Sequence, residues 1–337
     1  MRPTVRDVAA LAGVSPKTVS NVINGGVPVR PDTRQRVEAA LAELDYVPNL
    51  SARGLRNGRS GTIALALPDL GTSYSAELAR AFVELARGHG WAVQIDQTGS
   101  DPAREIDLIS RARAHLVDGL VLNPVTLGES VVANGRGLPP TVVIGEVEPQ
   151  DVDQVHVDSF AAGRDVGRLL IATGHRRIVL LGTSDDSFRT ASSETRHEGH
   201  RAALREAGLP EDPTLSIAVG SWSTSAAAAA MSRFLDQHGS PDAVFCFTDS
   251  MALGVLHVLA DRGVRVPEDV SVVGFDDIEE ASFAVPSLTT VSFDKRAIAE
   301  AALTALERRI EDPDAPRIVQ VVPHHIVERA SVASRRG

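Results

Sequence analysis

The sequence is poor in three features that define whole classes of protein: it has one cysteine, few aromatic residues and no long apolar run. The single cysteine, Cys246, excludes an intrachain disulfide and a multi-cysteine zinc site. No stretch approaches the ~20 apolar residues that a membrane-spanning helix needs. The N-terminus MRPTVRDVAA lacks the apolar segment of a signal peptide. We therefore expect a soluble, cytoplasmic protein in which Cys246 is a buried, inert thiol.

Common enzyme signatures are missing as well. There is no GxxxxGK[ST] phosphate loop, no GxGxxG after a predicted strand and no GxSxG nucleophile elbow. His197 and His200 lie one helical turn apart, and His324 precedes His325. Neither pair has a clear third metal ligand, so we expect these histidines to be solvated. We expect no catalytic residue, no metal and no cofactor.

Charge is distributed unevenly along the chain. Residues 1–60 carry nine basic and five acidic side chains, whereas the remainder carries 25 basic and 39 acidic ones. A small basic head before a large acidic body predicts that the head binds a polyanion and the body does not.

Three short helices are predicted in residues 4–44. Thr4, with Asp7 three positions later, is a helix-start signal, and Ser15 before Pro16 is another. Apolar residues then recur at helical spacing, and two such helices joined by a short glycine-containing turn form a helix-turn-helix. Spacing alone also fits a three-helix bundle with a solvated polar face.

The second predicted helix exposes side chains that can read DNA. Lysine donates to guanine, asparagine pairs with adenine, and serine and threonine bind phosphates or bases. The motifs DVAALAGVS, TVSNVING, TRQRVEAALAELDYVPN and ARGLR resemble the DNA-binding head of the lactose/galactose repressor (LacI/GalR) family. The resemblance implies that residues 1–47 form this domain, with its second helix in the major groove. The candidate DNA contacts are Thr4, Ser15, Pro16, Lys17, Thr18, Ser20 and Asn21.

Residues 48–60 are similar to the family's hinge helix and linker. The part that resembles the helix itself, residues 49–56, has eight residues, which is below the ~12–15 residues that are marginally stable alone in water. The resemblance implies that it folds on operator DNA, where Leu55 wedges into a minor-groove base step. A plain flexible linker is the alternative. The further DNA contacts implied are Asn49, Arg53, Leu55 and Arg56.

From Gly61 onward, apolar strands alternate with helices. This pattern predicts parallel sheets covered on both faces, with a ligand at the carboxyl ends of the strands. The predicted strands are Thr62–Leu67, Ala92–Gln97, Gly119–Leu122, Thr141–Ile144, Arg177–Leu181, Ala243–Thr248 and Ser271–Phe275. The predicted helices are Ala76–Arg87, Ala103–Ala114, Ala161–Ala172, Glu198–Glu206, Ala226–Gln237 and Met251–Asp261.

The body also resembles the family's effector-binding core, which is related to periplasmic sugar-binding proteins. The matching stretches are TIALALPDL, VDGLVL, GHRRIVLLG, RHEGHRAAL and FTDSMALGVLHVLADRGVRVPEDVSVVGFDDIE. The resemblance implies an α/β core of two doubly wound parallel-sheet lobes over residues 61–337. Lobe 1 is then about 61–157 and 289–318, and lobe 2 about 158–288 and 319–330.

The same resemblance implies the effector site. Asp276 matches an acceptor of effector hydroxyls, Arg196 a binding arginine, and Trp222 an aromatic residue that covers the ligand. Carboxylates and guanidinium groups suit paired polar atoms. Each also has a structural alternative: a turn cap for Asp276, an ion pair with Glu194 or Glu198 for Arg196, and a core position for Trp222. The remaining candidates are Asp69, Tyr74, Asn123 and Thr248.

Two further positions depart from the family pattern. Glu146 stands near the cleft where an aspartate is common. Lys295 stands where some sugar-binding relatives have an aromatic residue; it favours an acidic or phosphorylated ligand or points to solvent, and we expect solvent.

These features imply a homodimeric repressor that releases a palindromic operator when a small molecule, a sugar or sugar derivative, binds between the lobes. With no heptad extension at the C-terminus, a dimer is expected over a tetramer. A corepressor-dependent repressor, a metabolite-binding module with a vestigial head and a sugar-processing enzyme are the alternatives.

Overall fold

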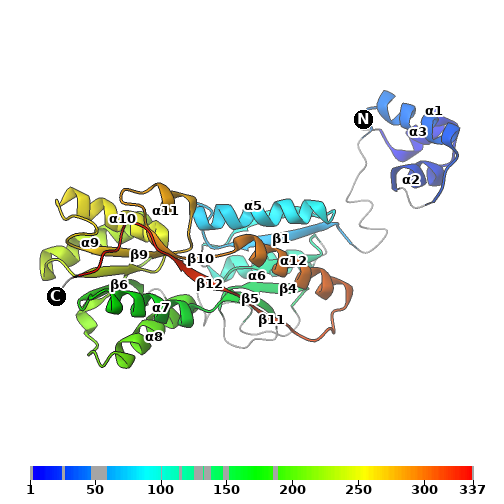
Figure 1. The fold of residues 1–337 in the computed structure, drawn as a ribbon. Helices are drawn as coiled ribbons and strands as arrows, with labels where there is room; N and C mark the ends of the chain where they lie inside the picture. The colour runs from blue at the N-terminus through cyan, green and yellow to red at the C-terminus, as the bar shows by residue number, and fades with distance from the viewer. Residues whose placement is uncertain are drawn as a thin grey trace. The chain divides into compact units, whose positions relative to one another are not determined.

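The computed structural model describes residues 3–24, 27–46, 59–99, 101–113, 116–124, 132, 138–146, 152–184 and 189–335. The chain forms two compact units, Met1–Ser60 and Gly61–Gly337 (Figure 1). None of the helices in these ranges is long and apolar enough to cross a membrane. The hinge candidates Asn49, Arg53, Leu55 and Arg56 lie outside the described residues.

The first unit contains three helices: α1 (Val5–Ala12), α2 (Pro16–Asn24) and α3 (Pro31–Glu43). Helices α1 and α2 begin where the sequence predicts. The Thr4 hydroxyl accepts a hydrogen bond from the backbone N–H of Asp7, and the Asp7 carboxylate accepts one from the backbone N–H of Thr4. These two bonds form a complete capping box. The Ser15 hydroxyl accepts from the backbone N–H of Thr18 at 3.1 Å. One apolar core joins the three helices.

The first sheet of the second unit has six parallel strands, in the order β11-β5-β4-β3-β1-β2. Side chains alternate along β1: Ile63 and Leu65 belong to the core that includes helices α5 and α12, whereas Ala64 and Ala66 pack with α6. The elements of this lobe are β1 (Thr62–Leu67), α5 (Ser73–Gly88), β2 (Ala92–Gln97), α6 (Pro102–Arg113), β3 (Gly119–Leu122), β4 (Thr141–Ile144), β5 (Asp153–Val157), α12 (Lys295–Glu311) and β11 (Val319–Val322).

The second sheet has the order β12-β10-β9-β8-β6-β7, with only β12 antiparallel to its neighbour. Helices α7 and α8 cover one face, and α9 and α10 cover the other (Figure 1). The elements of this lobe are α7 (Ser159–Ala172), β6 (Ile178–Thr183), α8 (Ala191–Glu206), a 3₁₀ turn (Pro213–Leu215), β7 (Ser216–Ala218), α9 (Thr224–His238), β8 (Ala243–Cys246), α10 (Asp249–Asp261), β9 (Ser271–Phe275), α11 (Glu279–Phe283), β10 (Thr289–Phe293) and β12 (His324–Val327).

The chain passes between the lobes three times, near Asp158, Asp294 and Pro323. The expected crossings at Leu288 and Val319 are therefore several residues too early. Strand β10 pairs with β9 in the second sheet, and β11 pairs with β5 in the first. An apolar run predicts a strand but does not reveal which sheet that strand joins.

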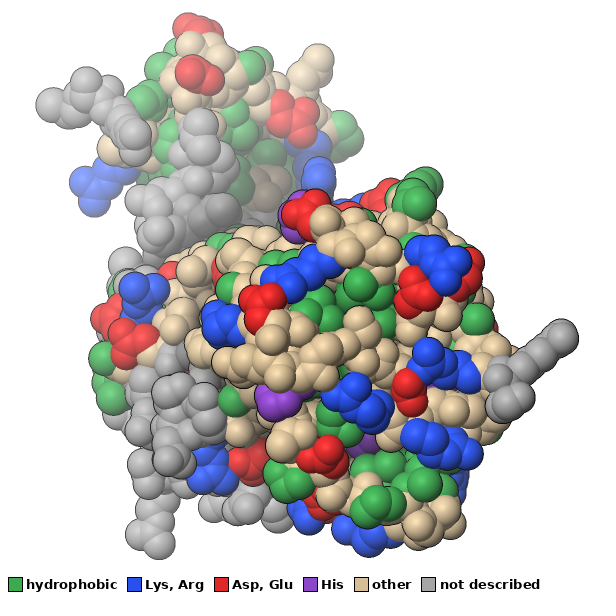
Figure 2. Space-filling model, turned by 90° about the vertical axis from the view of Figure 1, so that its left-hand side faces the viewer, with side chains coloured by type: hydrophobic (Ala, Val, Ile, Leu, Met, Phe, Trp, Pro, Cys, Tyr) green, Lys and Arg blue, Asp and Glu red, His purple; other side chains and the backbone are tan. Residues whose placement is uncertain are grey.

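The surface of the second lobe mixes acidic and basic side chains (Figure 2). Many of them form ion pairs, such as Arg262–Asp236 at 2.5 Å and Arg201–Glu211 at 2.7 Å. This mixture fits an acidic body that does not bind a polyanion.

His200 contradicts the expectation of a solvated histidine. It lies on α8 against α7 and is only 2% exposed. Helix α7 approaches His200 at Gly167, where an added Cβ atom would lie 3.0 Å from the His200 Nδ1 atom. Burial lowers the pKa of His200 from its ordinary value to about 4.

This burial predicts an acid-sensitive fold. Between pH 6.5 and about 4 the unfolded chain binds a proton at His200 that the folded chain does not, so the free energy of unfolding falls as the pH falls through this window. His200→Gln should flatten that dependence in urea denaturation at pH 7 and pH 5. His257→Gln, whose side chain is mostly exposed, is the matched control. A wild-type pH dependence in His200→Gln would contradict the assignment.

Candidate functional site

Helix α2 presents one polar face in the first unit. Val19 and Val22 point into the core, while Ser15, Pro16 and Lys17 are exposed. The Thr18 hydroxyl lies 2.9 Å from that of Ser15 at the helix start. Ser20 and Asn21 are half-buried one turn later on the same side, and Thr4 is exposed at the start of α1. The predicted DNA contacts that the structure describes thus lie at helix starts or along the outer face of α2.

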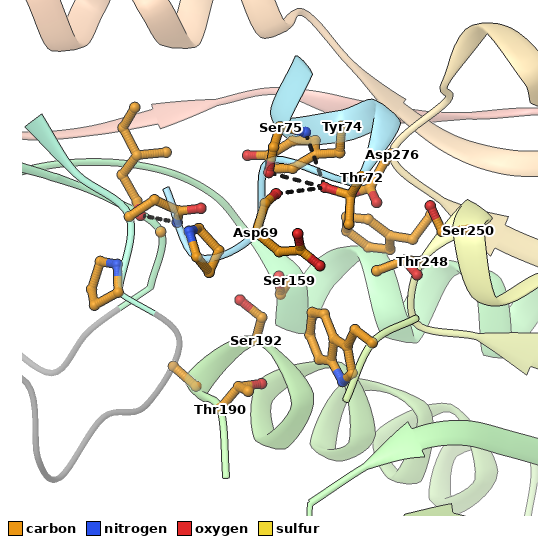
Figure 3. Close-up of a pocket in the computed structure, with 18 of the residues that line it drawn as sticks. Asp69, Thr72, Tyr74, Ser75, Ser159, Thr190, Ser192, Thr248, Ser250 and Asp276 are labelled. Atoms are coloured by element: carbon orange, nitrogen blue, oxygen red, sulfur yellow. Dashed lines mark hydrogen bonds between the residues drawn. The ribbon is translucent and has the colours of Figure 1, made fainter. Parts of the chain in front are cut away.

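A cavity of about 620 Å³ lies between the two lobes at the carboxyl ends of their strands (Figure 3). The fold creates this position because parallel strands bring their following loops to one edge of the sheet. All seven effector candidates line it: Asp69, Tyr74 and Asn123 from lobe 1, and Arg196, Trp222, Thr248 and Asp276 from lobe 2.

Asp276 stands in a strained turn directly after β9. Asp276 has φ 110° and Asp277 has φ 49°, both in the left-handed region that non-glycine residues rarely adopt. The buried carboxylate of Asp249 holds this turn, accepting from the backbone N–H of Ile278 at 2.9 Å and from the Thr290 hydroxyl at 2.6 Å. Burial raises the pKa of Asp276 to about 8, against the opposing charge of Arg196.

Arg196 extends from α8 into the same region. Its guanidinium carbon lies 3.4 Å from the ring centroid of Phe275 and 5.4 Å from that of Trp222. One guanidinium nitrogen donates to the carbonyl of Phe247. The alternative ion pairs do not form, because Glu194 pairs with Arg189 and Glu198 pairs with Arg201.

Arg196 is held in place by a close helix crossing. A Cβ atom at Gly163 of α7 would lie 2.3 Å from the Arg196 carbonyl oxygen, and one at Gly199 of α8 would lie 2.1 Å from the Phe160 carbonyl oxygen. Glycines on both helices therefore bring α8 close to α7 and fix the backbone that carries Arg196.

Glu146 and His156 form a second polar cluster on the cavity wall. The Glu146 carboxylate accepts from the backbone N–H of Ser159 at 2.7 Å and the Thr195 hydroxyl at 2.9 Å, and lies 3.7 Å from His156 Nδ1. Burial opposes ionisation, but the nearby His156 side chain and the hydrogen bonds from Ser159 and Thr195 outweigh it and hold the pKa of Glu146 below its ordinary value. The nearby Glu146 carboxylate in turn raises the pKa of His156.

Sequence reasoning missed the small polar residues of the wall. Many stand at helix starts, where their side chains also cap backbone N–H groups; the Thr190 hydroxyl, for example, accepts from the backbone N–H of Ser193 at 2.9 Å. Cap signals after strands could have identified several of these residues. The polar wall residues that were not predicted are Thr72, Ser75, Gln97, Ser159, Thr190, Ser192, Ser221, Ser223 and Ser250.

The expectation that Lys295 points to solvent is wrong. Its side chain is 11% exposed, and its Nζ atom lies 3.1 Å from the Glu77 carboxylate. Nζ also donates to the Asp277 carbonyl at 3.0 Å. Among the described residues around the cavity, Arg196 is thus the one arginine or lysine, facing the carboxylates of Asp69, Glu146 and Asp276.

Two doubly wound lobes around a ligand-sized cavity, together with a helix-turn-helix unit, define a ligand-binding DNA-binding regulator. Residues 4–49 match the family model described as bacterial regulatory proteins of the lacI family. Residues 168–332 match the periplasmic binding protein-like domain. The chain belongs to the lacI family of bacterial regulatory proteins.

Similar proteins support this membership over the whole chain. The transcriptional regulator CelR of Thermobifida fusca is 34% identical, covering 98% of both chains. A solved complex of CelR with cellobiose is 32% identical, with a TM-score of 0.72 over 98% of this chain and 100% of the other. The lac repressor dimer bound to operator and the anti-inducer ONPF is 27% identical, with a TM-score of 0.86 over 99% and 100%.

Gly163→Ala should displace Arg196 and destabilise the core. The added methyl group forces α7 and α8 apart, and overpacking of this kind costs ~1–3 kcal/mol. Urea denaturation should show a loss of that size. Gly88→Ala, on α5 with open space around it, is the matched control and should leave stability unchanged or slightly higher. Equal stability of the two variants would show that the crossing is not tight.

Proposed function

We propose that this chain is a cytoplasmic, homodimeric transcriptional repressor whose effector is an uncharged glycoside of disaccharide size. Residues 1–47 bind a palindromic operator, residues 48–60 form the hinge, and effector binding between the lobes releases the DNA. The observation that carries the proposal is the cavity, which combines three acidic side chains and many hydroxyl groups with the aromatic ring of Trp222.

The charges of the wall favour a neutral ligand. Asp69, Glu146 and Asp276 face the cavity, and the guanidinium of Arg196 is already stacked on Phe275 and bonded to a backbone carbonyl. A phosphate or carboxylate would bring further negative charge without a free cation among the described wall residues, which costs binding energy. Paired hydroxyls instead suit carboxylate acceptors.

The size of the site and a solved relative support a disaccharide. A volume of about 620 Å³ is within the ~300–1,000 Å³ of small-molecule sites. The related regulator CelR is solved with cellobiose. In this chain Trp222 and Phe293 offer apolar surfaces to the C–H faces of sugar rings.

Control of DNA binding follows from the connectivity. The hinge residues 48–60 immediately precede β1, so they join the head to lobe 1. An effector that binds one relative arrangement of the lobes more tightly shifts the population toward it. In a dimer this shift changes the separation of the two hinges and thereby the affinity for a palindrome. A ligand that tightens operator binding would instead identify a corepressor.

The ligand prediction is tested by thermal-shift screening followed by calorimetry. Cellobiose and other neutral disaccharides should stabilise the chain more than their phosphates; a ligand at 100 times its Kd contributes ~2.7 kcal/mol. Measured above pH 8, where Asp276 is ionised, Asp276→Asn should weaken binding about tenfold or more, because a hydrogen bond to a charged group contributes ~1.5–3 kcal/mol. Asp261→Asn, on the exposed end of α10, is the control. Preferential binding of sugar phosphates would overturn the neutral class.

The DNA prediction uses operators selected from random duplexes by the full chain. Affinity should fall steeply between ~50 and ~200 mM salt, as phosphate contacts require. Removing residues 1–59 should abolish binding and leave a folded core. Lys17→Ala should relax base preference, with a loss of ~1–3 kcal/mol on the selected site. Operator binding by the core alone would refute the assignment of the head.

A further inference from the structure

Three polar contacts join the lobes beside the cavity, between helices α5 and α12 of lobe 1 and the segment of lobe 2 that follows Asp276. The Glu77 carboxylate of α5 accepts from the backbone N–H of Glu279 at 2.9 Å. The Ser73 hydroxyl, one turn earlier, donates to the Glu280 carboxylate at 2.6 Å. Lys295 donates to the Asp277 carbonyl at 3.0 Å. Each contact pairs a residue of lobe 1 with one of lobe 2.

Lys295 is the centre of this group. It is the first residue of α12, immediately after the chain crosses from the second sheet to the first. Its ammonium group lies 3.1 Å from Glu77 and 5.6 Å from the ring centroid of Phe293. Neither Lys295 nor Glu77 belongs to the cavity wall, whereas the neighbouring Phe293 does. Lys295 therefore contacts the turn that carries Asp276 without itself lining the cavity.

We infer that Lys295, Glu77 and Ser73 form a clasp that positions the Asp276 turn against α5 and determines how readily the lobes separate. The turn needs such support because Asp276 and Asp277 both have positive φ. Within lobe 2 it is held by Asp249 and by Arg329, which donates to the Asp277 carboxylate at 2.7 Å. The clasp adds a link to lobe 1, so that a movement of the Asp276 turn is transmitted to α5.

The chemistry of the clasp favours a role in arrangement over a role in stability. Taking an ammonium group and a carboxylate out of water is costly, and well-packed apolar residues often replace such pairs with little loss of stability. What an apolar pair cannot supply is the directional bond to a backbone carbonyl across the cleft. The inference concerns the lobes alone and does not depend on which ligand binds.

The test measures the distance between the lobes in the full chain. Ala103→Cys on α6 and Thr224→Cys on α9 put exposed thiols on opposite lobes, after the carboxyl ends of β2 and β7. Cys246 is fully buried and should not label. Pulsed electron spin resonance between nitroxide labels then reports the lobe separation. Dilution with excess unlabelled chain leaves one labelled subunit in each dimer.

Lys295→Met and Glu77→Gln should each shift the distance distribution to longer and broader values without added ligand. Glu84→Gln is the matched control, because Glu84 lies on the same helix and faces Arg296 of the same lobe at 3.9 Å. It should reproduce the wild-type distribution. If either clasp variant fails to fold by circular dichroism, the other decides. Folded clasp variants with the wild-type distribution would overturn the inference.

Discussion

The site depends on the hydrogen bonds that the side-chain carboxylate of Asp249 accepts. This carboxylate is fully buried at the start of α10, where burial raises its pKa to about 7, and it holds both the Thr290 hydroxyl and the backbone N–H of Ile278. These bonds stabilise the positive-φ turn that carries Asp276. A buried polar group left without partners is costly, so this one carboxylate keeps the end of β9 in a single conformation. That turn places Asp276 in the cavity wall, and it places the backbone of Asp277 and Glu279 where they contact lobe 1.

The second constraint is the exchange of chain between the sheets. Three crossings join the lobes, so neither moves without displacing the segments near Asp158, Asp294 and Pro323. Polar contacts flank the cleft on both sides: Glu146 reaches Thr195, and Glu77 reaches Glu279. A ligand between them would act on a hinge that these few directional bonds hold, and coupling between distant sites requires that such a hinge have two arrangements.

The apolar strands and the general position of the site could be predicted from the sequence, because all seven predicted strands form and the loops after parallel strands converge. The polar strand β5 could not be predicted. Asp153 is buried there because Arg309, distant in sequence, donates to it at 2.9 Å. The sequence predicts helix α8 only from Glu198, but the helix begins at Ala191. Its first turns are polar and lack the apolar spacing from which a helix is predicted. The orientation of Lys295 depends on Glu77 from another helix. The burial of Asp153 and the orientation of Lys295 are thus decided by tertiary partners that local patterning does not contain.

In the proposed function, a ligand in the interlobe cavity controls DNA binding by this chain. The most direct measurement is a fluorescence-anisotropy titration of the selected operator with full-length protein, at fixed salt, across increasing concentrations of the disaccharide found by screening. We expect the operator Kd to rise at least tenfold in wild type, and we expect the midpoint of this rise to move to about tenfold higher ligand concentration or more in Asp276→Asn. An operator Kd independent of a ligand that calorimetry shows to be bound would contradict it.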